Sequence, residues 1–204
     1  MNNNVTAIVL FAEDYLESDK MVTLFSSEGE VFKAVMKGVK KQGAKLKFAA
    51  QPFSFCSFDV AKKGNRYTVT GASVIEELFS VTDYDSYTYG CAMLEAAYRV
   101  CCYAANPQIF VLLLRKLKEL IYRNNNSKIV LISFFQGCIH KSGFLYEYSP
   151  FDGKPTTVMQ LLTLTNRGVA DIDANEELVD LTLTRIYKRF CEIFECNLKS
   201  MSVL

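Results

Sequence analysis

The alternation of apolar and polar residues divides the chain into two parts with different periods. Over roughly the first eighty residues, apolar side chains occur at every second position or in short runs, the pattern of β-strands. Gly29, within residues 27–30, is placed to take the positive φ that a tight hairpin needs, and residues 62–65 form a second turn. Strands are therefore expected over residues 5–11, 21–26, 31–36, 53–58 and 67–71.

Five short strands joined by turns, without a long helix among them, predict a small closed barrel. The OB-fold is the five-stranded barrel of this kind, and closure also removes exposed strand edges. We therefore expect the N-terminal part of the chain to be an OB-fold.

After Tyr84 the apolar residues recur at helical spacing. Pro107 can open a helix because its missing N–H is tolerated in the first turn, and Asn126 or Ser127 can cap the next one. Helices are expected over residues 87–105, 107–123, 127–135, 156–164 and 175–196, the last burying Leu178, Leu181, Ile186, Phe190 and Ile193. The fold class is α+β: an OB-fold β-barrel over residues 1–82, followed by an all-α helical domain over residues 83–204.

Composition indicates an ordinary globular protein, with half of the residues apolar and about a fifth charged. No apolar run has the roughly 18 residues that a bilayer crossing needs, and no signal peptide is visible. The seven cysteines are odd in number and contain no Cys-x-x-Cys, while His140 is the single histidine. We therefore expect reduced thiols in a cytoplasmic protein, with no bound metal and no cofactor.

Charge is strongly segregated along the chain. Between Lys33 and Arg66 there are nine Lys or Arg residues and one acid, Asp59, a local charge of +8 in a chain whose net charge is +1. Such a basic segment attracts phosphate backbones through Coulomb steering and counterion release. Charge runs are also common on plain solvated surfaces, so this feature alone leaves both interpretations open.

Residues 37–48 carry most of this charge, with two glycines and five lysines in twelve residues. They are expected to be a flexible basic loop between two strands of the barrel, where lysines can contact phosphates without reading sequence. Nearby aromatic side chains can stack on unpaired bases, although a small barrel needs most of them for its core. The candidates for stacking are Phe32, Phe48, Phe53, Phe55, Phe58 and Tyr67.

The sequence offers little for catalysis. Cys138 and His140 are two residues apart, and such positions on a helix do not face each other. The acids at 13, 14, 17 and 19 can in principle hold magnesium, but acids around a turn are usually only solvated. There is no phosphate-binding Gly-x-x-x-x-Gly-Lys-Ser/Thr loop. We therefore do not expect an enzyme.

Six short pieces occur in a fixed order: residues 7–10 (AIVL), 17–25 (ESDKMVTLF), 29–31 (GEV), 37–40 (KGVK), 46–53 ending in QPF, and 197–200 (NLKS) followed by Leu204. In this order they resemble the bacterial RecO family of recombination mediators. The resemblance implies an OB-fold followed by a helical domain. It also implies binding of single- and double-stranded DNA, annealing of complementary strands, and partnership with RecR. A further implication is contact with the acidic C-terminal tail of SSB, with RecA loaded on SSB-coated DNA.

The resemblance also implies which residues act. Lys37, Lys40 and Lys41 fall on basic positions of the family and are expected to contact DNA phosphates, followed by Lys45, Lys47 and Arg66. Many family members carry a four-cysteine zinc ribbon where residues 148–155 contain no cysteine, so no zinc is expected here. For the SSB tail, Arg123, Lys128 and Phe135 are the candidates, because an acidic peptide needs a cation beside an apolar pocket.

Three function classes follow from these observations. The leading hypothesis is a DNA repair protein that anneals strands and mediates recombination. The second is a protein-interaction adaptor of the OB-fold type that contacts nucleic acid only secondarily. Binding driven by phosphates falls steeply with salt, whereas an apolar docking site barely responds. The third hypothesis, an enzyme, requires a metal or nucleotide that copurifies.

Overall fold

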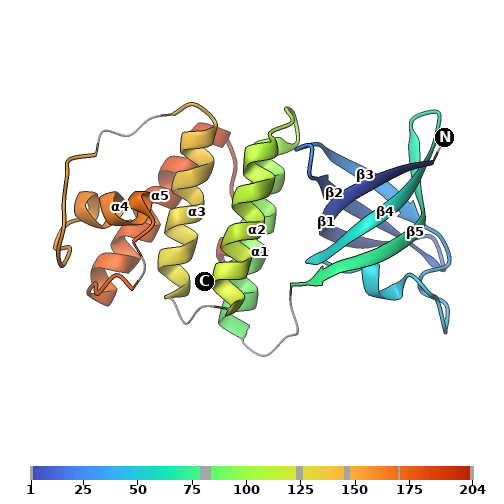
Figure 1. Cartoon of the computed structure of the whole chain (residues 1–204), viewed down its shortest axis with the longest axis horizontal. Coiled ribbons are helices and arrows are strands. Elements are labelled where there is room, and N and C mark those ends of the chain that lie inside the picture. The colour runs from blue at the N-terminus through green and yellow to red at the C-terminus, as the bar shows by residue number, and fades with distance from the viewer. Residues whose placement is uncertain (1, 79–83, 123–125, 145–147, 170, 203–204) are drawn as a thin grey trace. The chain divides into compact units, whose positions relative to one another are not determined.

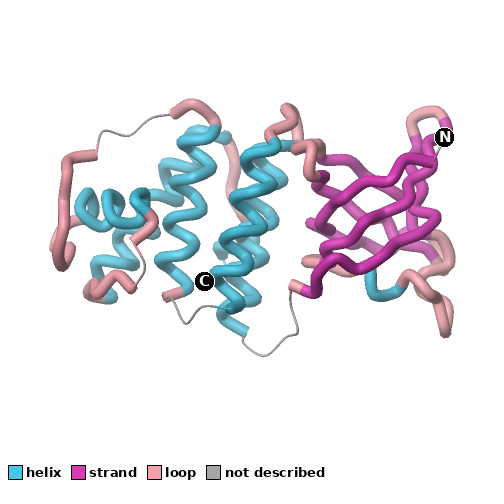
Figure 2. The backbone as a smooth tube through the Cα atoms, viewed as in Figure 1, coloured by secondary structure: helices cyan, strands magenta, loops and turns pink. Residues whose placement is uncertain are grey.

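The computed structural model describes residues 2–78, 84–122, 126–144, 148–169 and 171–202. The chain forms two compact units. The first, here called the barrel unit, holds residues 1–81 and 101–110; the second, the helical unit, holds residues 82–100 and 111–204. Among the described residues, strands occur in the barrel unit and the five long helices account for most of the helical unit (Figure 2).

The barrel unit is a closed five-stranded barrel with the strand order β1-β2-β3-β5-β4 (Figure 1). Strands β3 and β5 run parallel, and the other neighbours are antiparallel. The expected five-stranded OB-fold followed by helices is confirmed. The strands are β1 (Asn2–Tyr15), β2 (Asp19–Ser26), β3 (Val31–Met36), β4 (Ser54–Lys63) and β5 (Arg66–Glu77).

The length of β1 is what closes the barrel. Its first half pairs with β4, with Asn2 opposite Ala61, and its second half pairs with β2, with Tyr15 opposite Asp19. The register shifts between Val9 and Phe11, and such a bulge bends a strand enough to serve two neighbours. Sequence periodicity predicted the bounds of β3 correctly. It predicted β1 and β5 shorter than they are, because both strands continue through polar residues that face solvent.

The barrel interior is filled by inward-facing apolar side chains from every strand. Ala34 and Met36 of β3 alternate with more exposed residues, as a half-buried strand requires, whereas β2 is buried at every position from Val22 to Ser26. The loop between β3 and β4 also contributes to this core. The buried cluster comprises Ala7, Val9, Val22, Leu24, Ala34, Met36, Val39, Ala49, Ala50, Cys56, Phe58, Val60 and Val69.

Residues 101–110 pack on the barrel at the β2–β3 hairpin. Gly29 has φ +83°, as predicted, and its carbonyl oxygen accepts a hydrogen bond of 3.1 Å from the backbone N–H of Asn106. A Cβ at Gly29 would lie 2.3 Å from the carbonyl carbon of Asn106, so only glycine fits. The ring of Phe110 also contacts Phe25 and Phe55, with centroids 5.4 and 6.1 Å apart. The division expected from sequence had assigned this segment to the helical part.

The helical unit is built around α3, whose side chains are buried on nearly every face. Phe135 of α3 contacts Phe190 of α5, with ring centroids 4.9 Å apart. Asn126 caps α3 as expected, its side chain accepting from the N–H groups of Lys128 and Ile129. The long helices of the chain are α1 (Tyr84–Cys101), α2 (Pro107–Tyr122), α3 (Ser127–Lys141), α4 (Val158–Arg167) and α5 (Glu176–Phe194).

Two details of these helices differ from the sequence prediction. Helix α3 continues past Phe135 to Lys141. The polar side chain of Gln136 can be buried there because its amide donates a hydrogen bond of 3.0 Å to the Leu162 carbonyl. On α5, Leu181 is 45% exposed, so the predicted apolar stripe was wrong at that position. The buried side of α5 instead carries Val179, Thr182, Leu183, Ile186 and Phe190.

The segment after α5 is held by a buried carboxylate. Glu95 of α1, 7% exposed, accepts hydrogen bonds from the backbone N–H groups of Lys199 and Ser200 at 2.9 and 3.0 Å. The Ser200 hydroxyl donates to the same carboxylate at 2.7 Å, and Leu198 is buried beside it. This contact gives a structural reason for the Leu-Lys-Ser sequence at residues 198–200, where the short 3-10 turn η2 (Lys199–Ser202) begins.

Candidate nucleic-acid interface

The most basic feature of the barrel unit is the loop from Lys37 to Phe53 between β3 and β4, here called the connector. Its apolar residues point inward: Val39, Ala49 and Ala50 are 3%, 0% and 2% exposed and belong to the barrel core. The 3-10 turn η1 (Lys47–Ala49) shapes its second half. Because these apolar anchors fix the path of the chain, the lysines between them are turned to solvent.

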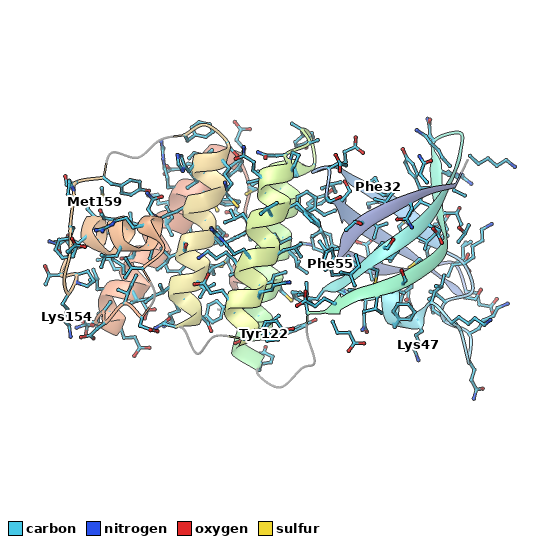
Figure 3. All side chains as sticks on the ribbon, viewed as in Figure 1. Phe32, Lys47, Phe55, Tyr122, Lys154 and Met159 are labelled. Carbon is cyan, nitrogen blue, oxygen red and sulfur yellow. The ribbon has the colours of Figure 1, made fainter. Side chains whose placement is uncertain are left out.

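Five predicted DNA-binding residues lie together on the connector. All five are exposed, and the labelled Lys47 is seen at one end of the barrel unit in Figure 3. Four of them form no ion pair with any residue that the structure describes. The five residues are Lys37, Lys40, Lys41, Lys45 and Lys47.

The connector is also tied to the turn between β1 and β2. The Asp19 carboxylate accepts a 2.7 Å hydrogen bond from the Gly38 N–H, and the Ser18 carbonyl accepts one of 2.9 Å from the Lys40 N–H. The sequence had suggested a flexible loop, but these bonds and the three buried anchors hold the connector at several points. Of the acids that sequence reasoning considered for magnesium, Asp19 serves this attachment instead.

Lys40 differs from the other connector lysines. Its ammonium Nζ lies 2.8 Å from Oδ2 of Asp14 in β1, an ion pair open to solvent. The hydrogen bond from Lys40 lowers the pKa of the Asp14 carboxyl below its usual value. At neutral pH the Asp14 carboxylate is therefore charged. It neutralises the ammonium of Lys40 and so weakens the attraction of Lys40 for a phosphate.

Arg66 lies on the β4–β5 hairpin and not on the connector. It begins β5 beside the end of β4, where Ala61 pairs with Asn2 at the start of β1, whereas Lys40 contacts Asp14 near the other end of that strand. Lys62, Lys63 and Arg66 are therefore a second basic group on the β4–β5 hairpin. This hairpin group lies beside β3, because Tyr67 pairs with Ala34, three residues before the connector begins at Lys37.

The aromatic candidates divide into core and surface residues. Phe53, Phe55 and Phe58 are 3%, 8% and 0% exposed and pack inside the unit. Phe48, on the connector, is 37% exposed, while Phe32 and Tyr67 are half-buried. Sequence reasoning missed Tyr103, which is 98% exposed in the barrel unit, because a single tyrosine after a helix carries no periodic signal.

Of the residues proposed from sequence for the SSB tail, Phe135 is buried and Lys128 is already paired with carboxylates. Phe135 is 0% exposed within the core of the helical unit, so it offers no apolar surface to a partner. The Lys128 ammonium binds the Asp180 carboxylate at 2.5 Å and lies 3.5 Å from that of Glu176; the hydrogen bond with Asp180 raises the Lys128 pKa. Arg123 lies outside the described residues.

The helical unit does contain a groove of about 890 Å³. Its walls combine the apolar side chains of Leu112 and Ile129 with basic residues from three helices and with the acids Glu119, Asp171 and Asp173. Its floor includes the buried Gln136, whose amide donates to the hydroxyl of Tyr148 at 3.0 Å. The basic residues along the groove are Arg115, Lys116, Lys118, Lys141 and Arg167.

No catalytic arrangement is formed by the residues that sequence reasoning considered. Cys138 is 0% exposed, whereas His140 faces solvent, so the two side chains do not share a site. In the described part of the chain, no three His, Cys, Asp or Glu residues gather closely enough to hold a metal ion. None of the helices built from described residues has the length and apolar character of a membrane span.

Comparison with known proteins adds family information to this geometry. Residues 1–78 match the family model described as "Recombination protein O N terminal". Proteins named "DNA repair protein RecO" are similar over about two thirds of the chain. Those from a Nocardioides species and from Thermobifida fusca are both 29% identical, over 68% and 67% of the chain, and one from Streptomyces avermitilis is 26% identical over 70%. The chain spans 58% of the length of the first two relatives and 61% of the third.

The strand order, the lysine-bearing connector and the helices that follow define an OB-fold protein with a cationic surface and an all-helical second part. Within that class, the match of residues 1–78 to the family model and the similarity over about two thirds of the chain make it similar to the RecO family of DNA repair proteins.

Proposed function

We propose that the chain is a recombination mediator that binds single- and double-stranded DNA through the connector of its barrel. In this proposal it anneals complementary strands and acts with RecR to help load RecA on SSB-coated DNA. The observation that carries the proposal is the display of Lys37, Lys41, Lys45 and Lys47 on a segment anchored by buried residues. A fixed array of ammonium groups is suited to phosphates and carries little sequence information.

Annealing by such a surface needs no covalent step. Two complementary strands repel each other through their phosphates, and neutralisation by lysines lowers this repulsion and releases condensed counterions. Bound strands can then meet at a higher local concentration and pair. Because phosphate contacts are common to both forms of DNA, the same surface serves single strands, duplexes and the annealing intermediate between them.

The contact with the acidic SSB tail is proposed for the groove of the helical unit, in place of Lys128 and Phe135. An acidic peptide that also carries apolar residues needs cations beside an apolar wall, and the groove provides Arg115 and Lys118 close to Leu112 and Ile129. In the double variant Arg115→Glu and Lys118→Glu, binding of a synthetic SSB tail peptide should be lost, whereas Lys128→Gln should leave it unchanged. Equal peptide binding by both variants would refute this location.

The DNA-binding proposal is tested by fluorescence anisotropy with labelled single and double strands at low salt. The triple variant Lys37→Gln, Lys41→Gln and Lys45→Gln should weaken binding of both by at least about tenfold, since each lysine is an exposed phosphate contact. A matched control, Lys118→Gln, Lys154→Gln and Lys188→Gln, removes the same charge from the helical unit. Equal losses in both triple variants would mean that only net charge matters, and the connector proposal would fail.

A further inference from the structure

The barrel unit contains a hollow of about 790 Å³ at the end where β1 begins and β4 ends. Its walls are the first residues of β1, the β2–β3 hairpin, the facing parts of β4 and β5, and residues 101–105. All of these belong to the barrel unit. We call this hollow the aromatic groove. Figure 3 shows its labelled residue Phe32 well apart from Lys47 of the connector.

Three aromatic side chains line the aromatic groove. The rings of Phe32 and Tyr67 lie 5.0 Å apart between centroids and are inclined by 50°. Both are only half-buried although they pack against the barrel core, so part of each ring faces the groove. Tyr103 is 98% exposed and has no part in any core. These rings are platforms on which a flat aromatic ligand can stack.

The charges around the aromatic groove are arranged in two zones. Lys62 lines it, with its ammonium 5.0 Å from the ring centroid of Tyr67, and exposed Lys63 and Arg66 follow on the same hairpin. Within the groove, the exposed residues Glu28, Glu30 and Asn3 supply hydrogen-bond acceptors. A phosphate is attracted to the basic β4–β5 hairpin and repelled by the carboxylates of Glu28 and Glu30. The amino group of a base, in contrast, can donate a hydrogen bond to either carboxylate.

We propose that the aromatic groove takes the unpaired bases of single-stranded DNA, stacked on Tyr103 and on the Phe32–Tyr67 pair. Lys62, Lys63 and Arg66 contact the phosphates of the same strand. Cytosine, adenine and guanine are preferred over thymine, because their exocyclic amino groups meet the acceptors of Glu28 and Glu30. A duplex cannot use the groove, since its bases are already stacked and paired, so the groove gives the barrel a preference for single strands. This inference rests on the proposed binding of DNA by the barrel unit.

The chain contains no tryptophan, so Tyr103→Trp introduces a single fluorescent reporter at the groove. The variant is titrated at low salt with an oligomer of twenty deoxycytidines and with an abasic strand of equal length and phosphate number. Stacking should quench the tryptophan with the oligocytidine only, and that strand should bind about 5- to 150-fold more tightly than the abasic one. In Tyr103→Ala this advantage should shrink at least about fivefold, with abasic binding unchanged.

Phe48→Trp places the matched reporter on the connector. Quenching of that tryptophan by oligocytidine, without quenching in Tyr103→Trp, would place the bases at the connector and overturn the aromatic groove. Equal affinity for both strands without quenching in Tyr103→Trp would also overturn it, while leaving phosphate binding by the connector intact. If neither strand binds, the DNA-binding proposal itself fails and the groove proposal fails with it.

Discussion

The ammonium of Lys40 lies 2.8 Å from a carboxylate oxygen of Asp14, twenty-six residues earlier in the chain. The pair joins the connector to the second half of β1, beside the hydrogen bonds that the Ser18 carbonyl and the Asp19 carboxylate accept from the connector. Of the five connector lysines, Lys40 thus has a second role, since it helps to fix the loop that displays the others.

Removing the negative charge of Asp14 should strengthen DNA binding. In Asp14→Asn, Lys40 becomes available to phosphates, and a repulsive carboxylate leaves the surface. We expect affinity for single strands at low salt to rise roughly two- to fivefold, the scale of one exposed charge contact. Glu17→Gln is the control, because this exposed acid of the same turn pairs with no described lysine. Anisotropy titrations that show weaker binding for Asp14→Asn would mean that the fixing role of the pair outweighs its charge.

The same pair sets a pH dependence at the acidic end. Because Lys40 holds the pKa of Asp14 below 3.8, the pair stabilises the fold above that pH and loses its effect as the pH falls through the lowered pKa. Between pH 5 and 8 Asp14 should therefore make no contribution to any change in DNA affinity, and titrations of wild type and Asp14→Asn should run parallel over this range.

Because residues 101–110 pack closely on the β2–β3 hairpin, alanine should destabilise the protein more at Gly29 than at Gly64. Gly29 and Gly64 both have positive φ in hairpins, +83° and +60°, but only Gly29 faces backbone atoms at 2.3 Å. Gly64→Ala should lower the free energy of unfolding by about 1 kcal/mol through backbone strain alone. Gly29→Ala should cost roughly 3 kcal/mol or more, because the peptide at Asn106 must move. If urea unfolding shows the same loss of unfolding free energy for both variants, the close approach of Asn106 to Gly29 does not affect stability.

Glu95 is expected to stabilise the helical unit through the segment that follows α5. In Glu95→Gln one acceptor oxygen is replaced by an amide donor that faces the N–H of Lys199 or Ser200. The expected loss is about 1–3 kcal/mol of unfolding free energy, the usual cost of an unsatisfied buried donor. Glu192→Gln, on the exposed side of α5, should change stability by less than about 0.5 kcal/mol. A loss in Glu95→Gln no larger than that would show that the carboxylate is dispensable.

A buried thiol should make the barrel sensitive to alkali. Burial raises the pKa of Cys56 from 9.0 to about 11, so between these pH values the unfolded chain releases a proton that the folded barrel retains. Stability should therefore fall by about 1.4 kcal/mol for each pH unit in this window on account of Cys56. In Cys56→Ala this part of the slope should disappear, which denaturant unfolding from pH 8 to 11 can measure. An unchanged slope would contradict the prediction.

The sequence predicts well those features that depend on neighbours along the chain. The bounds of β3, the positive φ of Gly29, the Asn126 cap and the exposure of the connector lysines all follow from local patterns. What it missed depends on distant partners: Lys40 meets Asp14 through the pairing of β1 with β2. Likewise, Phe135 is covered by α5, and Arg66 is brought beside β3 by the parallel pairing of Tyr67 with Ala34. Such relations arise only when the barrel closes and the helices pack.

The most direct test of the account is the salt dependence of DNA affinity with and without the connector lysines. Wild type and the quadruple variant Lys37→Gln, Lys41→Gln, Lys45→Gln and Lys47→Gln are titrated with a single strand over several salt concentrations. If the connector is the phosphate-binding surface, the slope of log affinity against log salt should become about 3 units less steep, roughly 0.7 for each lost contact. Identical slopes for the two proteins would contradict the account.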